Sequence, residues 1–420
     1  MLDIKFIREN ADLIKAGAIK KHLTVDIDRL LAVDADRRSL LTAVETARAR
    51  QNQVSQEVPS AAPERKQELL TEMKLLKETL TKDEERLKEV DHEWQLLMVS
   101  VPNIPDLSVP EGSSDADNAE VRVWGEKPDI KNPKSHVELM QVLDIADFER
   151  GTKTAGFRGY FLKGDGALLN YAVWQFVMDH FVKKGGFTPM LVPSLVKRVA
   201  FLGTGYLPQG EEDLYKTQDG DFLAGTGEVA TMAYYMNETL DKKNLPIKMI
   251  SFSPCFRREA GSHGKDTKGL MRVHEFFKFE QVVLCEASHE ESVRLHEELT
   301  KNAEELLQAL KLPYHVVINC GGDLGLGQVK KYDIETWVPS EGRYRETHSS
   351  SYFHDFQTRR LNIRYRDEQS ALQYAHSLNN TALATPRILI AIIENNQNED
   401  GSITVPEVLR PYLGKDRISK

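Results

Sequence analysis

The chain has 420 residues, of which 40% are hydrophobic and 28% are charged. A chain of this length buries a sizeable core and is expected to fold as two domains. The formal net charge of −9 excludes a global positive field that would attract a polyanion, so a nucleic-acid surface would have to be a local patch.

The three cysteines, Cys255, Cys285 and Cys320, lie far apart in the sequence and form no CxxC pair. This spacing excludes a disulfide framework and a thiolate zinc site, so we expect no zinc. The first residues, MLDIKFIRENADLIKAG, contain no signal-type apolar stretch. No apolar run reaches the roughly 18 residues that a membrane span needs. We therefore expect a cytoplasmic protein with no membrane segment.

Two long amphipathic helices are predicted in the N-terminal quarter of the chain. Apolar residues recur at helical spacing over 27–58 and again over 69–97. Pro59 and Pro63 bracket a short break between the two runs. This pattern favours an antiparallel helical hairpin whose arms are each on the order of 50 Å long. Taken alone, it suits a dimerising coiled coil equally well.

A compositional boundary follows the second helix. Residues 100–120, SVPNIPDLSVPEGSSDADNAE, are rich in Pro, Ser, Gly and acidic side chains, a composition typical of a linker or surface loop. We therefore expect one domain over 1–105, a linker or surface loop over 106–134, and a second domain over 135–420. In the second domain short β-rich runs alternate with helices, without long parallel crossovers. This favours an α+β domain with an antiparallel sheet flanked by helices.

Two stretches of the second domain alternate apolar and chemically active residues. In MISFSPCFRRE, Arg257 and Glu259 share one face, and in VHEFFKFEQVVL, Phe276, Lys278 and Glu280 share one. If these strands pair antiparallel, Arg257, Glu259, Phe276 and Glu280 can line one surface. The Arg257 guanidinium would then suit a phosphate and the Phe276 ring a nucleobase. A solvated sheet face with surface ion pairs would give the same pattern. The connection 260–271, AGSHGKDTKGLM, is expected to be mobile.

The stretch FRREAGSHGKDTKGLMRVHEF resembles the second signature motif of class II aminoacyl-tRNA synthetases, in the form that seryl-tRNA synthetases have. Other segments resemble the same family in the same order along the chain. MLDIKFIREN resembles its start, ETARARQNQVSQEV the first helix of its tRNA-binding hairpin, KKGGFTPMLVPSLV motif 1, and LNNTALATPRILIAIIENNQ motif 3. The resemblance thus extends over nearly the whole chain.

The resemblance implies a ligase that uses ATP to activate L-serine as seryl-adenylate and transfers the seryl group to the 3′ end of tRNA(Ser). It leaves open whether tRNA(Sec) is charged as well. It also implies that the N-terminal hairpin binds the tRNA and that motif 1, around Pro193, lies at a homodimer interface. Two alternatives remain: a non-catalytic paralogue that binds RNA, and an amino acid:carrier-protein ligase, although such ligases lack the hairpin.

The resemblance also assigns an ATP site. Arg257 would contact the α-phosphate, Phe276 would stack on adenine, and Arg387 would hold the terminal phosphate. Glu346 and Ser349 would bind Mg²⁺ through oxygen, the ligand atom that this cation prefers. The catalytic members would be Arg257, Arg387 and Glu346, and the full ATP set is Arg257, Arg258, Glu259, Arg272, Val273, Phe276, Glu346, Thr347, His348, Ser349 and Arg387. For Arg272 the alternative is a plain surface charge.

A serine site is implied in the same way, with the members Thr226, Gly227, Glu228, Arg257, Glu280, Asn379 and Thr381. Without the resemblance, AGTGEVA would be interpreted as a helix N-cap. Because a carboxylate in an apolar strand is costly unless it is paired, we expect the hydroxyl or ammonium group of serine to be the partner of Glu280. Alanine would leave that carboxylate unsatisfied.

Two glycine features complete the sequence pattern. Ala382 and Ala384 stand where class II motif 3 often has glycines. This difference leaves the detailed backbone conformation at the start of the following helix unpredicted. The segment CGGDLGLGQVKKYDIETW is rich in glycine but lacks the GxGxxG order of a dinucleotide site. We interpret it as a loop in which two backbone segments approach closely.

Overall fold

The computed structural model describes residues 1–261, 264 and 266–420. The chain forms two compact units. The helical unit comprises Leu2–Ile19 and Leu23–Pro102, and the sheet unit comprises Met1, Lys20–His22 and Asn103–Lys420. Part of the connection 260–271, which was expected to be mobile, lies outside the described residues. Among the described helices, none has the length and apolar character needed to cross a membrane.

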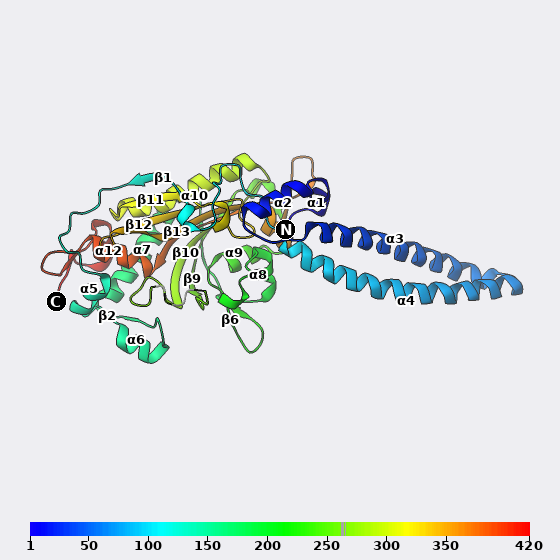
Figure 1. The fold of residues 1–420 in the computed structure, drawn as a ribbon, viewed down its shortest axis with the longest axis horizontal. Coiled ribbons are helices and arrows are strands. Elements are labelled where there is room, and N and C mark those ends of the chain that lie inside the picture. The colour runs from blue at the N-terminus through cyan, green and yellow to red at the C-terminus, as the bar shows by residue number, and fades with distance from the viewer. Residues whose placement is uncertain (262–263, 265) are drawn as a thin grey trace. The chain divides into compact units, whose positions relative to one another are not determined.

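The helical unit contains the predicted hairpin. Two short helices, α1 (Ile4–Glu9) and α2 (Ala11–Lys20), precede the long helices α3 (Ile27–Glu57) and α4 (Pro63–Ser100). The long helices lie side by side (Figure 1) and are joined through a 3₁₀ turn, Val58–Ser60. Helix α4 begins at Pro63, earlier than the predicted apolar run that starts at Leu69. Proline is compatible with this position because it is well tolerated in the first turn of a helix.

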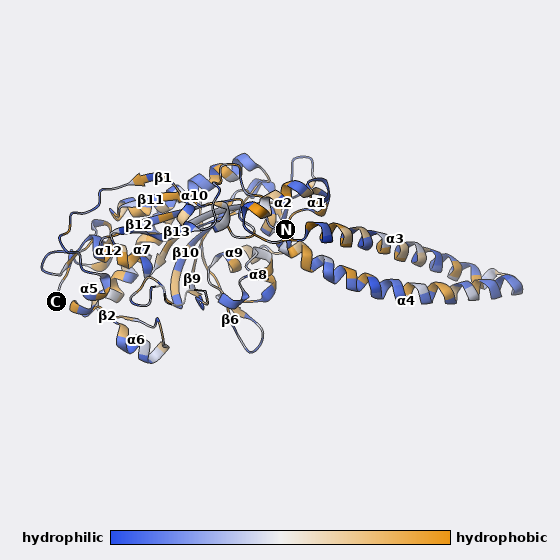
Figure 2. Ribbon diagram, viewed as in Figure 1, coloured by the Kyte–Doolittle hydropathy of each residue, from blue (hydrophilic) through white to orange (hydrophobic). Residues whose placement is uncertain are grey.

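Apolar residues hold the two long helices together. Those that are buried include Leu30 and Val54 of α3 and Leu69 and Val90 of α4, and Figure 2 shows orange and blue residues interspersed along both helices. Interhelical ion pairs add to this contact, namely Arg29–Glu93, Arg37–Asp91, Arg48–Glu84 and Arg50–Glu72. Exposed ion pairs contribute only about 0–1 kcal/mol each, so burial of the apolar residues dominates. Pairing within one chain therefore explains the pattern that also suited a dimerising coiled coil.

The sheet unit is built on an eight-stranded sheet with the order β1-β11-β12-β13-β16-β10-β9-β4. All neighbouring strands are antiparallel except β4 and β9. The strands are β1 (Ala119–Trp124), β4 (Thr188–Leu191), β9 (Ile247–Phe256), β10 (Glu275–Cys285), β11 (Tyr314–Ile318), β12 (Lys330–Val338), β13 (Arg343–His354) and β16 (His376–Thr385). The predicted α+β class with an antiparallel sheet is confirmed.

Helix α10 (His289–Ala309) covers one face of this sheet. The side chains of Gln281 and Asn380 donate hydrogen bonds to the carbonyl oxygen of Leu299 in this helix, at 3.1 and 2.7 Å. Helices α7 (Asp165–Lys184) and α12 (Arg387–Asn395) contribute buried apolar residues to the same core. Because side chains alternate along a strand, the neighbours of Gln281 point to the opposite, open face of the sheet.

The remaining elements are short. The helices are α5 (His136–Val142), α6 (Phe148–Ala155), α8 (Arg198–Thr204), α9 (Glu228–Ala233), α11 (Phe356–Leu361) and α13 (Arg410–Leu413), and the strands are β2 (Ala146–Asp147), β3 (Phe161–Leu162), β5 (Leu195–Val196), β6 (Tyr215–Lys216), β7 (Phe222–Leu223), β8 (Thr239–Asp241), β14 (Arg364–Arg366), β15 (Leu372–Tyr374), β17 (Ile403–Thr404) and β18 (Arg417–Ile418). Strand β1 lies within 106–134, where only a linker or surface loop was expected. It forms the edge of the large sheet by pairing with β11.

Candidate active site

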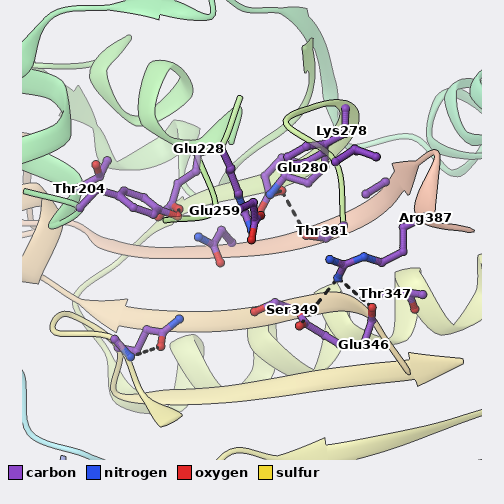
Figure 3. Close-up of a pocket in the computed structure, with 18 of the residues that line it drawn as sticks. Thr204, Glu228, Glu259, Lys278, Glu280, Glu346, Thr347, Ser349, Thr381 and Arg387 are labelled. Carbon is purple, nitrogen blue, oxygen red and sulfur yellow. Dashed lines mark hydrogen bonds and ion pairs between the residues drawn. The ribbon is translucent and has the colours of Figure 1, made fainter. Parts of the chain in front are cut away.

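A cavity opens on the face of the sheet opposite to α10, and most of the predicted site residues line it. Figure 3 shows several of them pointing into this space from different strands. The lining residues that were predicted are Glu228, Arg257, Glu259, Val273, Phe276, Glu280, Glu346, Thr347, Ser349, Asn379, Thr381 and Arg387. Residues that are more than a hundred positions apart in the sequence thus come together in one cavity.

The register of three strands brings these side chains together. Strands β9 and β10 pair antiparallel, as predicted, with Glu280 opposite Ser251. On its other side β10 pairs with β16, which sets Thr381 opposite Glu280. The predicted alternation along β10 also holds, because Phe276, Lys278 and Glu280 all line the cavity while Phe279 lies in the core.

Two arginines enter the cavity from different elements. Arg257 follows β9, its Nε donates to the carbonyl oxygen of Gly225 at 3.3 Å, and its guanidinium carbon lies 5.2 Å from the centre of the Phe276 ring. Arg387 is the first residue of α12 and donates to the carbonyl oxygens of Met271 and Glu346, each at 3.0 Å. These backbone contacts fix both guanidinium groups, which suit anionic oxygens.

The Glu346 carboxylate lies on the same side of the cavity as Arg387, with 3.9 Å between its Oε2 and a guanidinium nitrogen. The surrounding protein would raise the pKa of Glu346, but the charges of Arg387 and Lys331 hold that pKa below its usual value. Glu346 and Ser349 both present oxygen to the cavity. Within the described part of the chain, no group of three or more His, Cys, Asp or Glu could hold a metal, so a hard cation bound by these two oxygens would need further ligands from a substrate.

Glu259 is paired with a residue that lies just outside the cavity lining. One guanidinium nitrogen of Arg272 lies 2.5 Å from Oε2 of Glu259. Burial would raise the pKa of Glu259, but the hydrogen bond from Arg272 keeps that pKa below its usual value. The backbone at Glu259 has φ of 56°, the left-handed region that residues other than glycine rarely adopt. Arg272 is therefore an ion-pair partner rather than a free surface charge.

Glu280 has a partner in the protein itself. The Nζ atom of Lys278 lies 2.5 Å from Oε2 of Glu280, and the Thr381 hydroxyl donates to the same oxygen at 3.4 Å. Lys278 and Glu280 are only 7% and 2% exposed. The expectation that a ligand compensates the buried carboxylate is wrong, because Lys278 already does so.

Glu228 is a second buried carboxylate at this cavity. The Tyr206 hydroxyl donates to its Oε2 at 2.9 Å and the Gln357 amide donates to its Oε1 at 2.6 Å. Burial raises the pKa of Glu228, while these two hydrogen bonds oppose the rise. Both donors come from other elements, since Tyr206 follows α8 and Gln357 lies in α11. The two hydrogen bonds fix the position of the carboxylate.

Several predicted residues do not line the cavity. The Thr226 hydroxyl accepts a hydrogen bond from the backbone N–H of Glu228 at 3.3 Å, just before α9, but the N-cap residue of that helix is Gly227, which has no side chain to cap it. Gly227 lies against Ser251, where an added Cβ would be 2.8 Å from the hydroxyl. Arg258 is exposed. His348 is buried, its Nδ1 lies 2.8 Å from the Thr347 hydroxyl, and burial lowers its pKa to about 4.

The cavity also contains residues that were not assigned to a site. The sequence contained a signal for Lys278, because it alternates with Phe276 and Glu280 along one strand. It contained none for Tyr206, since no pattern in that segment links Tyr206 to Glu228. The loop Gly325–Gln328 also lines the cavity, and its glycines had suggested only close backbone approach. At Gly327 an added Cβ would lie 2.6 Å from the Phe356 ring, so the absence of a side chain permits that packing.

Comparison with known proteins gives consistent results over the whole chain. The family described as Seryl-tRNA synthetase N-terminal domain matches residues 1–105, and the tRNA synthetase class II core domain (G, H, P, S and T) matches residues 215–396. A protein named Serine--tRNA ligase from Deinococcus radiodurans is 48% identical over 416 residues, covering 99% of this chain and 98% of that protein. Another of that name, from Thermodesulfovibrio yellowstonii, is 44% identical over 428 residues and both chains are fully covered.

A solved structure agrees with these relatives. The crystal structure of seryl-tRNA synthetase from Pyrococcus horikoshii complexed with ATP matches with a TM-score of 0.91 and 38% identity, covering 100% of this chain and 99% of that one. Identity at this level over the full length, together with both domain matches, shows common descent and not merely a shared fold. The chain belongs to the seryl-tRNA synthetase family of the class II aminoacyl-tRNA synthetases.

Proposed function

We propose that this chain is an ATP-dependent ligase that activates L-serine and transfers it to the 3′ end of tRNA(Ser). The observation that carries the proposal is the cavity on the class II sheet, where two fixed arginines and two buried carboxylates face one space. Full-length relatives named Serine--tRNA ligase support the same activity. The hairpin of α3 and α4 argues against a carrier-protein ligase, because such ligases lack it.

In the activation step the serine carboxylate attacks the α-phosphorus of ATP. A P–O bond forms to serine, the bond to the β-phosphate breaks, and pyrophosphate leaves. Arg257 is suited to neutralise charge on the α-phosphate, and Arg387 to hold the terminal phosphate. The Phe276 ring, against which Arg257 lies, offers a face for adenine. The solved relative in complex with ATP supports ATP as the nucleotide.

Glu259 and Arg272 act together in this proposal. Their 2.5 Å ion pair orients the Glu259 carboxylate, which we assign to the adenine. Arg272 would contact the outgoing pyrophosphate only after exchanging part of this contact for phosphate oxygens. Val273, Thr347 and the backbone around Arg258 and His348 complete the nucleotide site.

Mg²⁺ is assigned to Glu346 and Ser349, whose oxygens face the cavity beside Arg387. When bound, the cation would neutralise phosphate charge and orient the triphosphate. Glu346 is suited to this role because Arg387 and Lys331 keep its carboxyl ionised.

The serine end of the cavity is assigned to two carboxylates. Glu228, held by Tyr206 and Gln357, is suited to the substrate ammonium group, and Glu280 with Thr381 to the hydroxyl. Asn379 adds a polar side chain at the same end. Thr226 and Gly227 contribute through the turn that positions Glu228. In the transfer step the terminal adenosine hydroxyl attacks the seryl carbonyl carbon and AMP leaves.

We assign binding of tRNA(Ser) to the hairpin of α3 and α4. A groove between these helices is lined by Arg38, Arg50 and the hydroxyls of Ser39, Thr42 and Thr46, side chains that commonly contact a nucleic-acid backbone. Both arginines are ion-paired, Arg38 with Asp34 and Arg50 with Glu72, so they would contact RNA by exchanging part of these pairs for phosphate oxygens. Charging of tRNA(Sec) by the same route would follow if that tRNA presents the same features.

We also infer a homodimer and a cytoplasmic location. The edge strand β4 of the large sheet ends at Leu191, which is 82% exposed, and the nearby Leu195 is 51% exposed. Exposed apolar side chains of this size beside an unpaired sheet edge favour a partner surface. Replacing Leu191 by glutamate should shift the protein from dimer to monomer in sedimentation velocity. A species of unchanged mass would contradict the assignment of this surface.

Pyrophosphate exchange with each amino acid in turn tests the activity itself. Serine is expected to support exchange of label between pyrophosphate and ATP, and a chain that responds to a different amino acid or to none would refute the proposal. A variant that lacks residues 27–98 tests the arm. It should retain serine-dependent exchange and lose tRNA charging, whereas efficient charging would refute the assigned role of the hairpin.

A further inference from the structure

Lys278 is the one lysine that lines the cavity among the residues that the structure describes. It lies two residues before Glu280 on β10, so strand alternation places both side chains on the open face of the sheet. The 2.5 Å ion pair between them is buried, and the charges of both groups act on Glu228. None of the roles assigned above uses this lysine.

The charges at this end of the cavity require a cation. Glu228 and Glu280 place two carboxylates in a space with little access to water. Two buried carboxylates without a cation would be costly, because burial disfavours uncompensated negative charge. The Lys278 ammonium compensates one of the two charges. One negative charge remains, and it complements the ammonium group of an amino-acid substrate.

The contacts of Glu280 leave one of its oxygens available. Lys278 and Thr381 both contact Oε2. Within the described part of the chain, the hydrogen bond to this carboxylate reaches Oε2, and none reaches Oε1. An ionised carboxylate is an acceptor at both oxygens, so Oε1 offers an acceptor to a ligand in the cavity.

We propose that Lys278 is a specificity-determining positioning residue of the serine site, which compensates the buried Glu280 carboxylate and holds its Oε2 so that Oε1 accepts the substrate hydroxyl. This inference rests on the proposed function. A desolvated carboxylate acceptor discriminates strongly, because an amino acid without a hydroxyl leaves it unsatisfied. Lys278 holds that acceptor in place, so the lysine strengthens the rejection of alanine.

Replacing Lys278 by methionine tests the role, because methionine keeps much of the side-chain volume and removes the charge. We measure pyrophosphate exchange of the full-length protein with serine and, separately, with alanine, at saturating ATP. The ratio of kcat/KM for serine to that for alanine should fall by about tenfold or more. The KM for serine should rise while the KM for ATP stays within about twofold, a split that a general loss of structure would not produce.

Three further variants control the experiment. Lys278→Gln keeps a hydrogen-bond donor without the charge and should also lower the ratio, so the test does not depend on the methionine variant folding. Lys278→Arg keeps the charge and should recover part of the ratio. Lys248→Met removes an ion pair of the same 2.5 Å length, to Glu298, outside the cavity lining, and should leave the ratio unchanged.

The outcomes separate this inference from the proposed function. A wild-type protein that does not exchange with serine would overturn the proposed function. If the wild type responds to serine and both neutral variants keep the wild-type ratio of serine to alanine, only the role of Lys278 is overturned. An equal fall in the Lys248 variant would likewise overturn it, because the effect would then follow the loss of any such ion pair.

Discussion

Glutamine in place of Glu280 probes the proposed serine contact with the least disturbance of shape. The glutamine oxygen can still accept hydrogen bonds from Lys278 and Thr381, which now lie 2.5 and 3.4 Å from Oε2. The amide nitrogen then stands where Oε1 accepts the substrate hydroxyl, so the variant loses both the negative charge and that acceptor. A hydrogen bond to a charged group contributes about 1.5–3 kcal/mol. Its loss corresponds to a factor of about 10–150 in binding.

Initial rates of pyrophosphate exchange measure this loss. For Glu280→Gln we expect the KM for serine to rise about 10- to 150-fold and the KM for ATP to change less than about twofold. Glu280→Ala also removes the contacts with Lys278 and Thr381 and should raise the serine KM at least as much. Both variants also leave the Lys278 ammonium without its counter-charge, and breaking a buried pair from one side is destabilising. Urea unfolding therefore accompanies the kinetics.

Glu304→Gln provides the matched control. Glu304 is 7% exposed and pairs with Arg122 at 2.7 Å, as Glu280 pairs with Lys278, but it does not line the cavity. Its variant should lose stability and keep the wild-type KM for serine. Glu280 would be excluded as a serine contact if its glutamine variant folded normally and bound serine with an unchanged KM.

Three other changes give separate expectations. Arg387→Ala removes a guanidinium fixed by two backbone carbonyls, and we expect kcat/KM in pyrophosphate exchange to fall by about 10²–10³. Glu346→Gln should raise the Mg²⁺ concentration that gives half-maximal exchange, and an unchanged Mg²⁺ dependence would contradict the assigned cation contact. Burial lowers the pKa of His296 to about 4, so its unfolded form, with a pKa near 6.5, binds a proton first as the pH falls. The free energy of unfolding should therefore drop by about 2 kcal/mol from pH 7 to pH 5 through this residue alone, and urea unfolding of His296→Gln should show a smaller drop than the wild type.

Much of the architecture followed from periodicity. The apolar spacing over 27–58 and the prolines after it identified the hairpin, because a helix pattern interrupted by proline can continue only after a turn. The two-residue alternation of β10 also identified a common face for Phe276 and Glu280, and Arg257 follows directly after β9. The pairing of β9 with β10 has no register shift, so the simple rule applies along its whole length.

Partners from distant segments could not be predicted in this way. Gln357 lies in α11 and Tyr206 follows α8, yet both donate to Glu228. Their positions depend on how the helices pack on the sheet, and no local pattern encodes that packing. The ion pair of Arg272 with Glu259 also depends on a chain reversal, of which the sequence showed only the glycines and polar residues.

The remaining differences lie where the sheet itself departs from regular alternation. The pairing of β12 with β13 shifts register between Ile334 and Glu335, which leaves Thr347 as an extra residue. Such a bulge lets consecutive residues point the same way. Glu346, Thr347 and Ser349 accordingly line the cavity while His348 turns into the interior.

The pairing of β10 with β16 shifts in the same manner, between Phe279 and Glu280, and leaves Ala382 as the extra residue. Strict alternation would put Thr381 and Leu383 on one face, but Thr381 lines the cavity and Leu383 lies in the core. Ala384 and Arg387 then reach the cavity on the far side of the bulge. Because a bulge redirects every later side chain on its strand, the contribution of motif 3 to the site depends on this one inserted residue. Alanine, small and fully buried at position 382, occupies the bulge without needing glycine.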